Sequence, residues 1–301
     1  MALFACSHST SRCAMRIYVI GANGFLGTHL LAWFEKVGEV RKAPSHDVVD
    51  PAGWQQAVME DLCAFKPNVV LIPGASQNMG DDAAALHSLI ASNCVLPCLV
   101  AQQLVTYAPQ AKLVVFGTSW QFADSDIYRP FNLYAASKQA GQDLLEHFAL
   151  RGLKVLQLIM FDTYGEGDTR RKLLKILQDA CVRDEEIGTT PGEQEIDLVD
   201  IEDVCAGVEA AIRELDTWDA SQGALVRGLG SGAPIRVKDL VTRVGAQAGK
   251  PLRAKIGERD YRPREVMKVY RDYRRPSGWS PKVTEFQQSS PPQDSASNAD
   301  E

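Results

Sequence analysis

Residues 21–27, Gly21-Ala22-Asn23-Gly24-Phe25-Leu26-Gly27, decide the fold of this chain. An apolar, β-branched run over 16–20 precedes them and predicts a short buried strand, and apolar residues at helical spacing follow as far as Gly38. Between a strand and a helix, these glycines predict a dinucleotide-binding turn: Gly21 allows the tight turn, Gly24 lets the backbone approach a pyrophosphate, and Gly27 lets helix and strand pack closely. The helix N-terminus then offers free N–H groups and its positive dipole end to the phosphates. Glycines also mark plain turns, so the context carries the prediction.

Further apolar runs extend this pattern along the chain. They predict strands over 69–72, 113–116 and 155–161, and helices over 83–107 (kinked at Pro97), 133–150, 170–181 and 203–213. Strands that are apolar on both faces and alternate with helices predict an α/β fold, a Rossmann-type doubly wound parallel sheet. Polar residues gather directly after the strands, at the edge where such sheets bind ligands.

After about Thr163 the predicted elements become shorter and the sequence becomes richer in turns. We predict an N-terminal extension over 1–14 and a dinucleotide-binding Rossmann domain over 15–165. A small substrate-binding cap, interleaved with the last elements of the sheet, is predicted over 166–286. The Ser-, Pro- and Gln-rich residues 287–301 are predicted to be a disordered tail.

Composition limits the classes of function. The chain has 301 residues, 45% of them hydrophobic, and a net charge of −6, which argues against binding to nucleic acid or anionic membranes. Its seven cysteines follow no metal-binding spacing, so we predict free thiols in a reducing cytoplasm and no metal site. No stretch is expected to reach the roughly 18–20 apolar residues of a membrane span.

Tyr134 and Lys138 form a Tyr-x-x-x-Lys pair on the predicted helix over 133–150. Residues four apart share a helix face, so the lysine charge is expected to lower the phenol pKa from about 10 toward neutrality. Such a tyrosine exchanges a proton with a carbonyl or alcohol oxygen at neutral pH. The same pair also occurs on ordinary surface helices, so the pair alone does not establish a catalytic role.

Thr118 lies at the end of the strand before that helix, in Gly117-Thr118-Ser119. A hydroxyl at this place can bind the substrate oxygen beside the tyrosine. It can also simply cap the end of a strand. Ser119 is the alternative to Thr118, because the register can slip by one residue.

In this order, the glycine turn, Thr118 and the Tyr134–Lys138 pair resemble the extended branch of the short-chain dehydrogenase/reductase superfamily, the NAD-dependent epimerase/dehydratase family. Further similarities reach almost to Lys282: Phe161-Asp162-Thr163-Tyr164-Gly165, the stretch 194–203, and Gly278-Trp279-Ser280-Pro281-Lys282. The resemblance implies that Tyr134 is the acid/base, Lys138 its pKa-lowering and ribose-binding partner, and Thr118 the donor to the substrate oxygen.

The resemblance also implies the binding residues. The residues implied for the cofactor are Gly21, Asn23, Gly24, Phe25, Leu26, Gly27, Ser45, His46, Asp47, Val48, Gly74, Ala75, Ser76, Asn93, Lys138 and Phe161. Those implied for the substrate are Gln77, Asn78, Ser119, Trp120, Asp162, Arg170, Lys172 and Arg262, with Gln121 as a further candidate for the sugar pocket. Each arginine is also compatible with an ordinary surface charge or ion pair.

Two departures from the family narrow the expected reaction. The carboxylate pair that dehydratases carry after the active-site threonine is replaced by Ser119-Trp120, so dehydration is disfavoured. The family's NAD-binding aspartate falls near Ser45, between basic residues and His46, which favours NADP(H) over NAD(H).

A reductase usually draws on NADPH, whereas an epimerase usually holds NAD tightly and recycles it. We therefore expect this protein to catalyse a net reduction. The motifs are similar to those of nucleotide-linked 4-keto-6-deoxyhexose reductases of the CDP-abequose-synthase type, which act in deoxysugar biosynthesis. The implied substrate is therefore a CDP- or dTDP-linked 4-keto sugar, and the implied assembly is a homodimer. An NAD-dependent nucleotide-sugar epimerase is the alternative, and a non-catalytic dinucleotide sensor is disfavoured because both Tyr134 and Lys138 are present.

Overall fold

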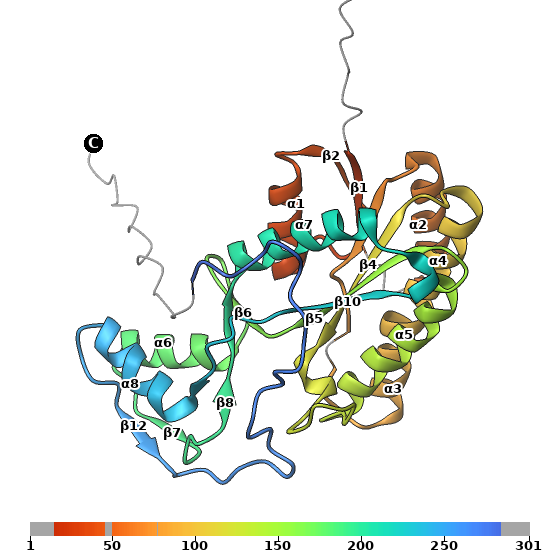
Figure 1. Ribbon diagram of the computed structural model, residues 1–301. Helices are drawn as coiled ribbons and strands as arrows, with labels where there is room; N and C mark the ends of the chain where they lie inside the picture. Colours follow the sequence, from red (N-terminus) through yellow and green to blue (C-terminus); the bar gives the residue numbers. More distant parts are fainter. Residues whose placement is uncertain (1–14, 46–49, 77, 284–301) are drawn as a thin grey trace, which may run out of the picture.

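The computed structural model describes residues 15–45, 50–76 and 78–283, and its centre is a six-stranded sheet. All of its neighbouring strands are parallel, in the order β10-β5-β4-β3-β1-β2 (Figure 1). The strands are β1 (Met15–Val19), β2 (Gly38–Lys42), β3 (Val69–Ile72), β4 (Lys112–Thr118), β5 (Lys154–Met160) and β10 (Leu225–Leu229). The predicted Rossmann-type sheet is confirmed.

Helices cover both faces of the sheet (Figure 1). On one face lie α1 (Phe25–Phe34) and α7 (Ile201–Thr217); on the other lie α2 (Pro51–Phe65), α4 (Leu96–Tyr107) and α5 (Leu133–Ala149). Buried side chains from alternate positions of the strands fill each interface, which is why the strands are apolar on both faces.

The direction of winding reverses between β1 and β3. The chain passes from β1 outward to β2, and then returns to place β3 on the other side of β1. The carboxyl ends of β1 and β3 therefore form the switch point at which doubly wound sheets bind ligands. β10 and α7 join the sheet late in the sequence, so the sheet is interleaved with the region that follows residue 165.

A smaller unit, called the cap below, lies beside the sheet (Figure 1). Its helices α6 (Leu173–Arg183) and α8 (Val237–Gln247) share a separate apolar core that includes Leu177, Leu240 and Val244. Three short two-stranded pairs complete it: β6 (Asp162–Tyr164) with β9 (Leu198–Asp200), β7 (Ile187–Thr189) with β12 (Ala254–Ile256), and β8 (Glu195–Ile196) with β11 (Ile235–Arg236). The assignment of substrate binding to this unit stays a prediction, and the extension and tail lie outside the described residues.

The long helix predicted over 83–107 is divided into α3 (Ala83–Ile90), a π-helical turn η1 (Ala91–Val95) and α4. Pro97 lies in the first turn of α4 and has no N–H to donate to the Asn93 carbonyl four residues earlier. That carbonyl faces α5, where a Cβ on Gly141 would lie 2.0 Å from it. The wider turn therefore accommodates the proline.

The expectation that no stretch is long and apolar enough for a membrane span is wrong for this helical segment. Ala83–Tyr107 has 25 residues and a mean hydropathy of 1.7 in an 18-residue window, sufficient by length and composition. In the fold, its side chains Val100, Ala101 and Leu104 are buried against the sheet, and core helices of this kind pass the same test.

Candidate active site

The glycine turn brings the ends of β1 and β3 into backbone contact. Gly21 has φ +92°, and a Cβ on it would lie 2.3 Å from the Gly74 Cα. A Cβ on Gly27 would lie 2.2 Å from the Gly21 carbonyl oxygen, so α1 packs on the turn itself. Both close approaches require glycine, and they join the predicted cofactor residues Gly21, Gly27 and Gly74 in one structure.

Gly24 differs from its two neighbours in the motif. The nearest protein atom to a Cβ built there is 3.7 Å away, so no contact within the described protein requires glycine at this position. Gly24 is the N-cap of α1 and no side chain caps the helix, so the first N–H groups, including those of Phe25 and Leu26, face outward. The open space over Gly24 and these donors fit a dinucleotide pyrophosphate.

Alanine substitutions at Gly24 and Gly27 are expected to separate binding from folding. Gly27→Ala should lower the free energy of unfolding by about 1–3 kcal/mol, because its methyl overlaps the Gly21 carbonyl. Gly24→Ala should fold with a nearly unchanged melting temperature but weaken dinucleotide binding by at least about tenfold, since its methyl would fill the cradle. Thermal melting and cofactor titration measure both effects; normal cofactor affinity in Gly24→Ala would contradict this role.

Ser45 lies beside the glycine turn, after the end of β2. The Asn23 amide donates to the Ser45 hydroxyl at 3.3 Å, and Lys42 Nζ donates to the Asn23 oxygen at 3.2 Å. Arg41, in contrast, is held by Asp61 at 2.9 Å. The polar cluster Asn23–Lys42–Ser45 is thus exposed at the expected adenosine end of the site; the predicted contacts His46, Asp47 and Val48 lie outside the described residues.

Tyr134 and Lys138 lie one turn apart near the start of α5, which Asn132 caps by accepting from the Ala135 N–H. Lys138 Nζ is 5.8 Å from the centre of the Tyr134 ring. Burial lowers the pKa of Lys138 to about 8. Burial raises the pKa of Tyr134 to about 12, so the expected lowering is wrong for the protein alone: at this separation the ammonium does not offset the cost of burying a phenolate.

Thr118 ends β4 and caps the short helix η2 (Ser119–Gln121). Its hydroxyl accepts the Trp120 N–H at 3.3 Å, which leaves the hydroxyl proton available for another acceptor. Its own N–H donates to Gln121 Oε1 at 2.8 Å. Gln121 is fully buried, so its predicted place in the sugar pocket is wrong; its amide is part of the support beneath Thr118.

Asn93 lies in the π-helical turn and is buried. Its amide donates to the Ser137 hydroxyl at 2.8 Å, which links the turn to α5 between Tyr134 and Lys138. Asn93, Lys138 and Gly74 line one small cavity behind the predicted site. The structure therefore brings Asn93 to α5, the helix that carries Tyr134 and Lys138.

Other predicted cofactor and substrate residues have contacts of their own. Ser76 bonds through its backbone N–H to Ser92 and through its hydroxyl to Ser88, next to Ala75. The Phe161 ring is buried 4.9 Å from that of Tyr273. Asn78 accepts the Gly80 N–H. Gln77 lies outside the described residues.

The three cationic residues predicted to bind the substrate, Arg170, Lys172 and Arg262, are each paired with a carboxylate. Arg170 binds both Asp168 oxygens and stacks 4.1 Å above the Phe25 ring at the glycine turn. Burial would raise the pKa of Asp168, but the hydrogen bonds from Arg170 outweigh it and lower that pKa. Lys172 lies 3.4 Å from Asp162, and both line a pocket between α6 and the β6–β9 pair. Arg170 thus belongs to the cofactor side as much as to the cap.

Arg262 is paired with Glu265 at 2.7 Å and lies 5.3 Å from the centre of the Phe131 ring. Phe131 also packs edge-on against Trp120 at 5.2 Å. Two predicted substrate residues, Trp120 and Arg262, therefore come together although they are far apart in the sequence.

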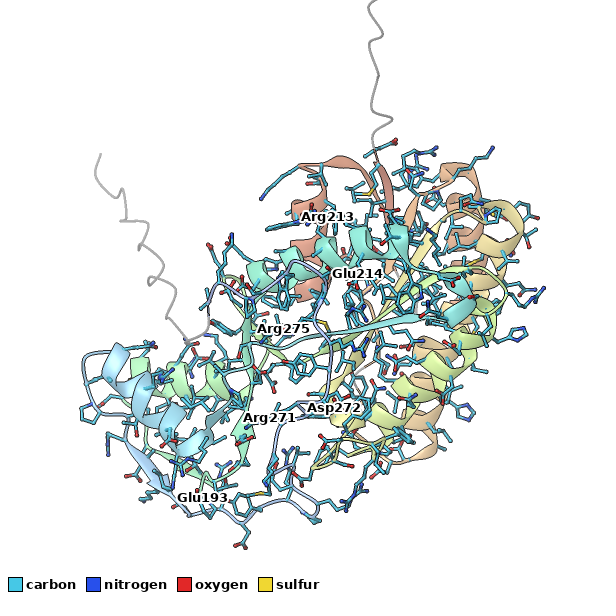
Figure 2. The ribbon with its side chains drawn as sticks, in the orientation of Figure 1. Glu193, Arg213, Glu214, Arg271, Asp272 and Arg275 are labelled. Atoms are coloured by element: carbon cyan, nitrogen blue, oxygen red, sulfur yellow. The ribbon has the colours of Figure 1, made fainter. Side chains whose placement is uncertain are left out.

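The segment after β12 returns between the cap and the sheet, and its residues Arg271 and Arg275 were not singled out from the sequence (Figure 1). Figure 2 shows Arg271, Asp272 and Arg275 along this segment. Arg271 pairs with Glu195 of β8, and Arg275 donates to the carbonyl oxygens of Gly230 and Ser231 after β10. These links fix the cap to the edge of the sheet. The many arginines of this segment were the feature of the sequence that could have indicated its role.

The model of the NAD dependent epimerase/dehydratase family matches residues 17–222. A CDP-abequose synthase of Yersinia pseudotuberculosis is 22% identical over 205 residues, which cover 64% of this chain and 72% of that protein. UDP-glucuronate 4-epimerase 3 of Arabidopsis thaliana is 25% identical over 279 residues, covering 77% of this chain and 64% of the relative.

Among solved structures, a UDP-glucuronic acid 4-epimerase from Bacillus cereus, in complex with a fluorinated UDP-sugar and NAD, has a TM-score of 0.74. It is 17% identical, and the match covers 89% of this chain and 95% of that one. At this identity the likeness establishes the fold.

Proposed function

This chain belongs to the NAD-dependent epimerase/dehydratase family, and from that premise we propose that it reduces the C4 keto group of a CDP- or dTDP-linked 4-keto-6-deoxyhexose with NADPH. The chain is an NAD(P)-dependent nucleotide-sugar enzyme of this family. The choice of reduction comes from the residues of this chain.

In the proposed reaction, bound NADPH supplies the hydride to C4 of the sugar. Tyr134 gives its phenolic proton to the ketone oxygen, and the Thr118 hydroxyl donates to the same oxygen. Lys138 favours the phenolate that remains, because its ammonium lies on the same helix face. A phenol pKa raised to about 12 by burial suits a group that must arrive protonated, while the positive charge must come close for the proton to leave.

The observation that carries the choice of NADPH is the cluster Asn23–Lys42–Ser45. Within the described residues, the end of β2 and the segment 43–45 carry no carboxylate. An acidic side chain there would bind the NAD ribose and repel a 2′-phosphate, whereas an amide, an ammonium and a hydroxyl can donate hydrogen bonds to the phosphate oxygens. A reductase draws on NADPH, which links this cluster to the reaction.

A carboxylate placed in this cluster is expected to reverse the preference. Ser45→Asp should weaken NADPH binding by at least about tenfold, about 1.4 kcal/mol, and leave NADH binding within threefold of its starting value. Fluorescence titration with both cofactors measures this. Ser45→Ala, which adds no charge, should change either affinity much less; equal effects of the two substitutions would argue against a 2′-phosphate at Ser45.

The decisive experiment is turnover of a panel of CDP- and dTDP-4-keto-6-deoxyhexoses, with NADPH consumption followed at 340 nm and compared with NADH. We expect stoichiometric NADPH oxidation with one of them. The alternative, an NAD-dependent epimerase, predicts NAD that stays with the purified protein and isomerisation of a nucleotide sugar without net cofactor consumption.

We also propose a homodimer through α4 and α5, as the resemblance implies. Tyr107 of α4, Leu144 of α5 and Leu150 at the end of α5 are exposed apolar side chains, and so are Leu86 and Ile90 of the preceding helix α3 and Val95 of the π-helical turn. Covering this surface would remove it from water. The mass of the protein in solution tests this, and a cytoplasmic location stays a prediction.

A further inference from the structure

Three glutamine side chains meet beneath Thr118. The Thr118 N–H donates to Gln121 Oε1 at 2.8 Å. Gln121 Nε2 donates to Gln139 Oε1 at 2.6 Å and to Gln142 Oε1 at 2.8 Å. The cluster therefore joins the end of β4 to α5 through side-chain amides alone.

The direction of these bonds is determined by the backbone. Because a peptide N–H can only donate, the atom facing Thr118 must be the Gln121 oxygen, and its nitrogen must then face the other two amides. Both nitrogen contacts are to oxygens, so every bond in the cluster has a donor and an acceptor. Gln121 is fully buried and Gln142 is 7% exposed, which makes the loss of any of these bonds costly.

Gly117 explains why the amides can lie so close to the strand. A Cβ on Gly117 would lie 2.5 Å from Gln121 Oε1 and 2.5 Å from Gln142 Nε2. The motif Gly117-Thr118-x-x-Gln121 thus leaves the space that the cluster fills.

Gln142 connects the cluster to the catalytic helix. It follows Lys138 by one helical turn and Tyr134 by two, so the three share a face of α5. Gln142 and Lys138 line the same small cavity, and Gln142 Nε2 has no hydrogen-bond partner among the described residues. The contact between Gln142 and Gln121 therefore ties the Thr118 backbone to the helix that carries Tyr134.

We propose that Gln121, anchored by Gln142, is a positioning residue that sets the separation between the Thr118 and Tyr134 hydroxyls. It touches no reacting atom: it holds the Thr118 backbone, and through it the hydroxyl that donates to the substrate oxygen. This inference rests on the proposed function, in which the Thr118 hydroxyl donates a hydrogen bond to the substrate oxygen.

A double-mutant cycle on kcat tests it, with the best-turned-over sugar of the panel and NADPH. Gln121→Leu should lower kcat about tenfold with KM for NADPH unchanged. In a Thr118→Val background the same substitution should cost less than twofold, because the hydroxyl that Gln121 positions is already gone. A tenfold loss in both backgrounds would mean a merely structural role and would overturn the proposal.

Gln121→Glu provides a conservative variant if the leucine variant folds poorly. A protonated carboxyl can accept from Thr118 and donate to Gln142, whereas a carboxylate would face two amide oxygens without a proton to give. Its kcat relative to the unmodified protein should therefore rise as the pH falls from 8 to 6. A pH-independent ratio would contradict the donor role of Gln121.

Amide exchange gives a readout without substrate. The Thr118 N–H should exchange at least tenfold faster in Gln121→Leu than in the unmodified protein. The control Gln157→Leu removes another buried glutamine that bonds the Gln142 carbonyl but not Thr118, and should leave that rate unchanged. Unchanged exchange in Gln121→Leu would overturn the inference. Retained turnover in Tyr134→Phe would instead remove the proposed function while leaving this exchange result intact.

Discussion

Replacing Tyr134 with phenylalanine is expected to lower kcat by about 10²–10⁴-fold, the range that general acid–base groups contribute. Tyr134 is the phenol on α5 that shares a helix face with the buried Lys138, and the Thr118 hydroxyl is assigned only a hydrogen bond to the ketone oxygen, not the transfer of its proton. The substitution removes one oxygen and leaves the ring in place, so cofactor affinity should stay within about twofold. Single-turnover measurements of NADPH oxidation separate the chemical step from binding.

The matched control is Tyr128→Phe, which removes the same oxygen from a tyrosine that is 48% exposed. That variant should keep its turnover and its cofactor affinity. Should Tyr134→Phe retain more than a tenth of the original kcat, Tyr134 would not be the acid/base of the reaction, and the reductase mechanism proposed for this chain would be lost.

The parallel sheet was predictable because most of its strands are buried on both faces. The strands over 69–72 and 113–116 read as continuous apolar runs and lie within β3 and β4. β2 was not predicted, since Glu39, Arg41 and Lys42 interrupt its apolar pattern at the edge of the sheet, where only one neighbour pairs with it. The π-helical turn before Pro97 could not be foreseen either, because it depends on Gly141 in a different helix.

The site divides in the same way. Tyr134, Lys138 and the three glycines are set by spacing within one helix or one turn, so a local pattern predicts their placement. The pairing of Arg170 with Asp168 and Phe25 depends on how the cap folds back on the glycine turn, which no local pattern encodes. The Gln121–Gln142 contact is intermediate: a glutamine one turn after Lys138 was visible in the sequence, but its partner is a separate strand end.

Replacing Lys138 with methionine is expected to stabilise the cofactor-free protein while removing most of its activity. Lys138 is buried, and burial lowers its pKa from 10.5 to about 8. At about 1.4 kcal/mol for each pKa unit, holding this ammonium in the folded protein costs about 3 kcal/mol. Methionine has a similar length and carries no charge, so Lys138→Met should raise the free energy of unfolding at pH 7 by up to that amount.

The pH dependence of this gain distinguishes a charge effect from better packing. Below pH 8, Lys138 is protonated in both the folded and the unfolded chain, and the full cost applies. Between pH 8 and 10.5, the folded protein releases the proton while the unfolded chain keeps it, so the stability of the unmodified protein contributed by this group rises with pH. The advantage of Lys138→Met should therefore shrink as the pH rises from 8 and vanish near 10.5.

Denaturant unfolding at pH 7, 9 and 10.5 measures this advantage, with Lys175→Met as the control. Lys175 pairs with Asp179 on the surface of α6, and its replacement should change stability by less than about 0.5 kcal/mol at each pH.

In Lys138→Met, kcat should fall by about 10²-fold or more, because Tyr134 loses the only cation assigned to its phenolate. A gain in stability that persists unchanged at pH 10.5 would trace to packing. A loss of stability at pH 7 would mean that the buried ammonium is compensated by its surroundings. A gain that fades with pH, together with lost turnover, would show that this fold carries an unfavourable buried charge at the position where the proposed proton transfer requires one.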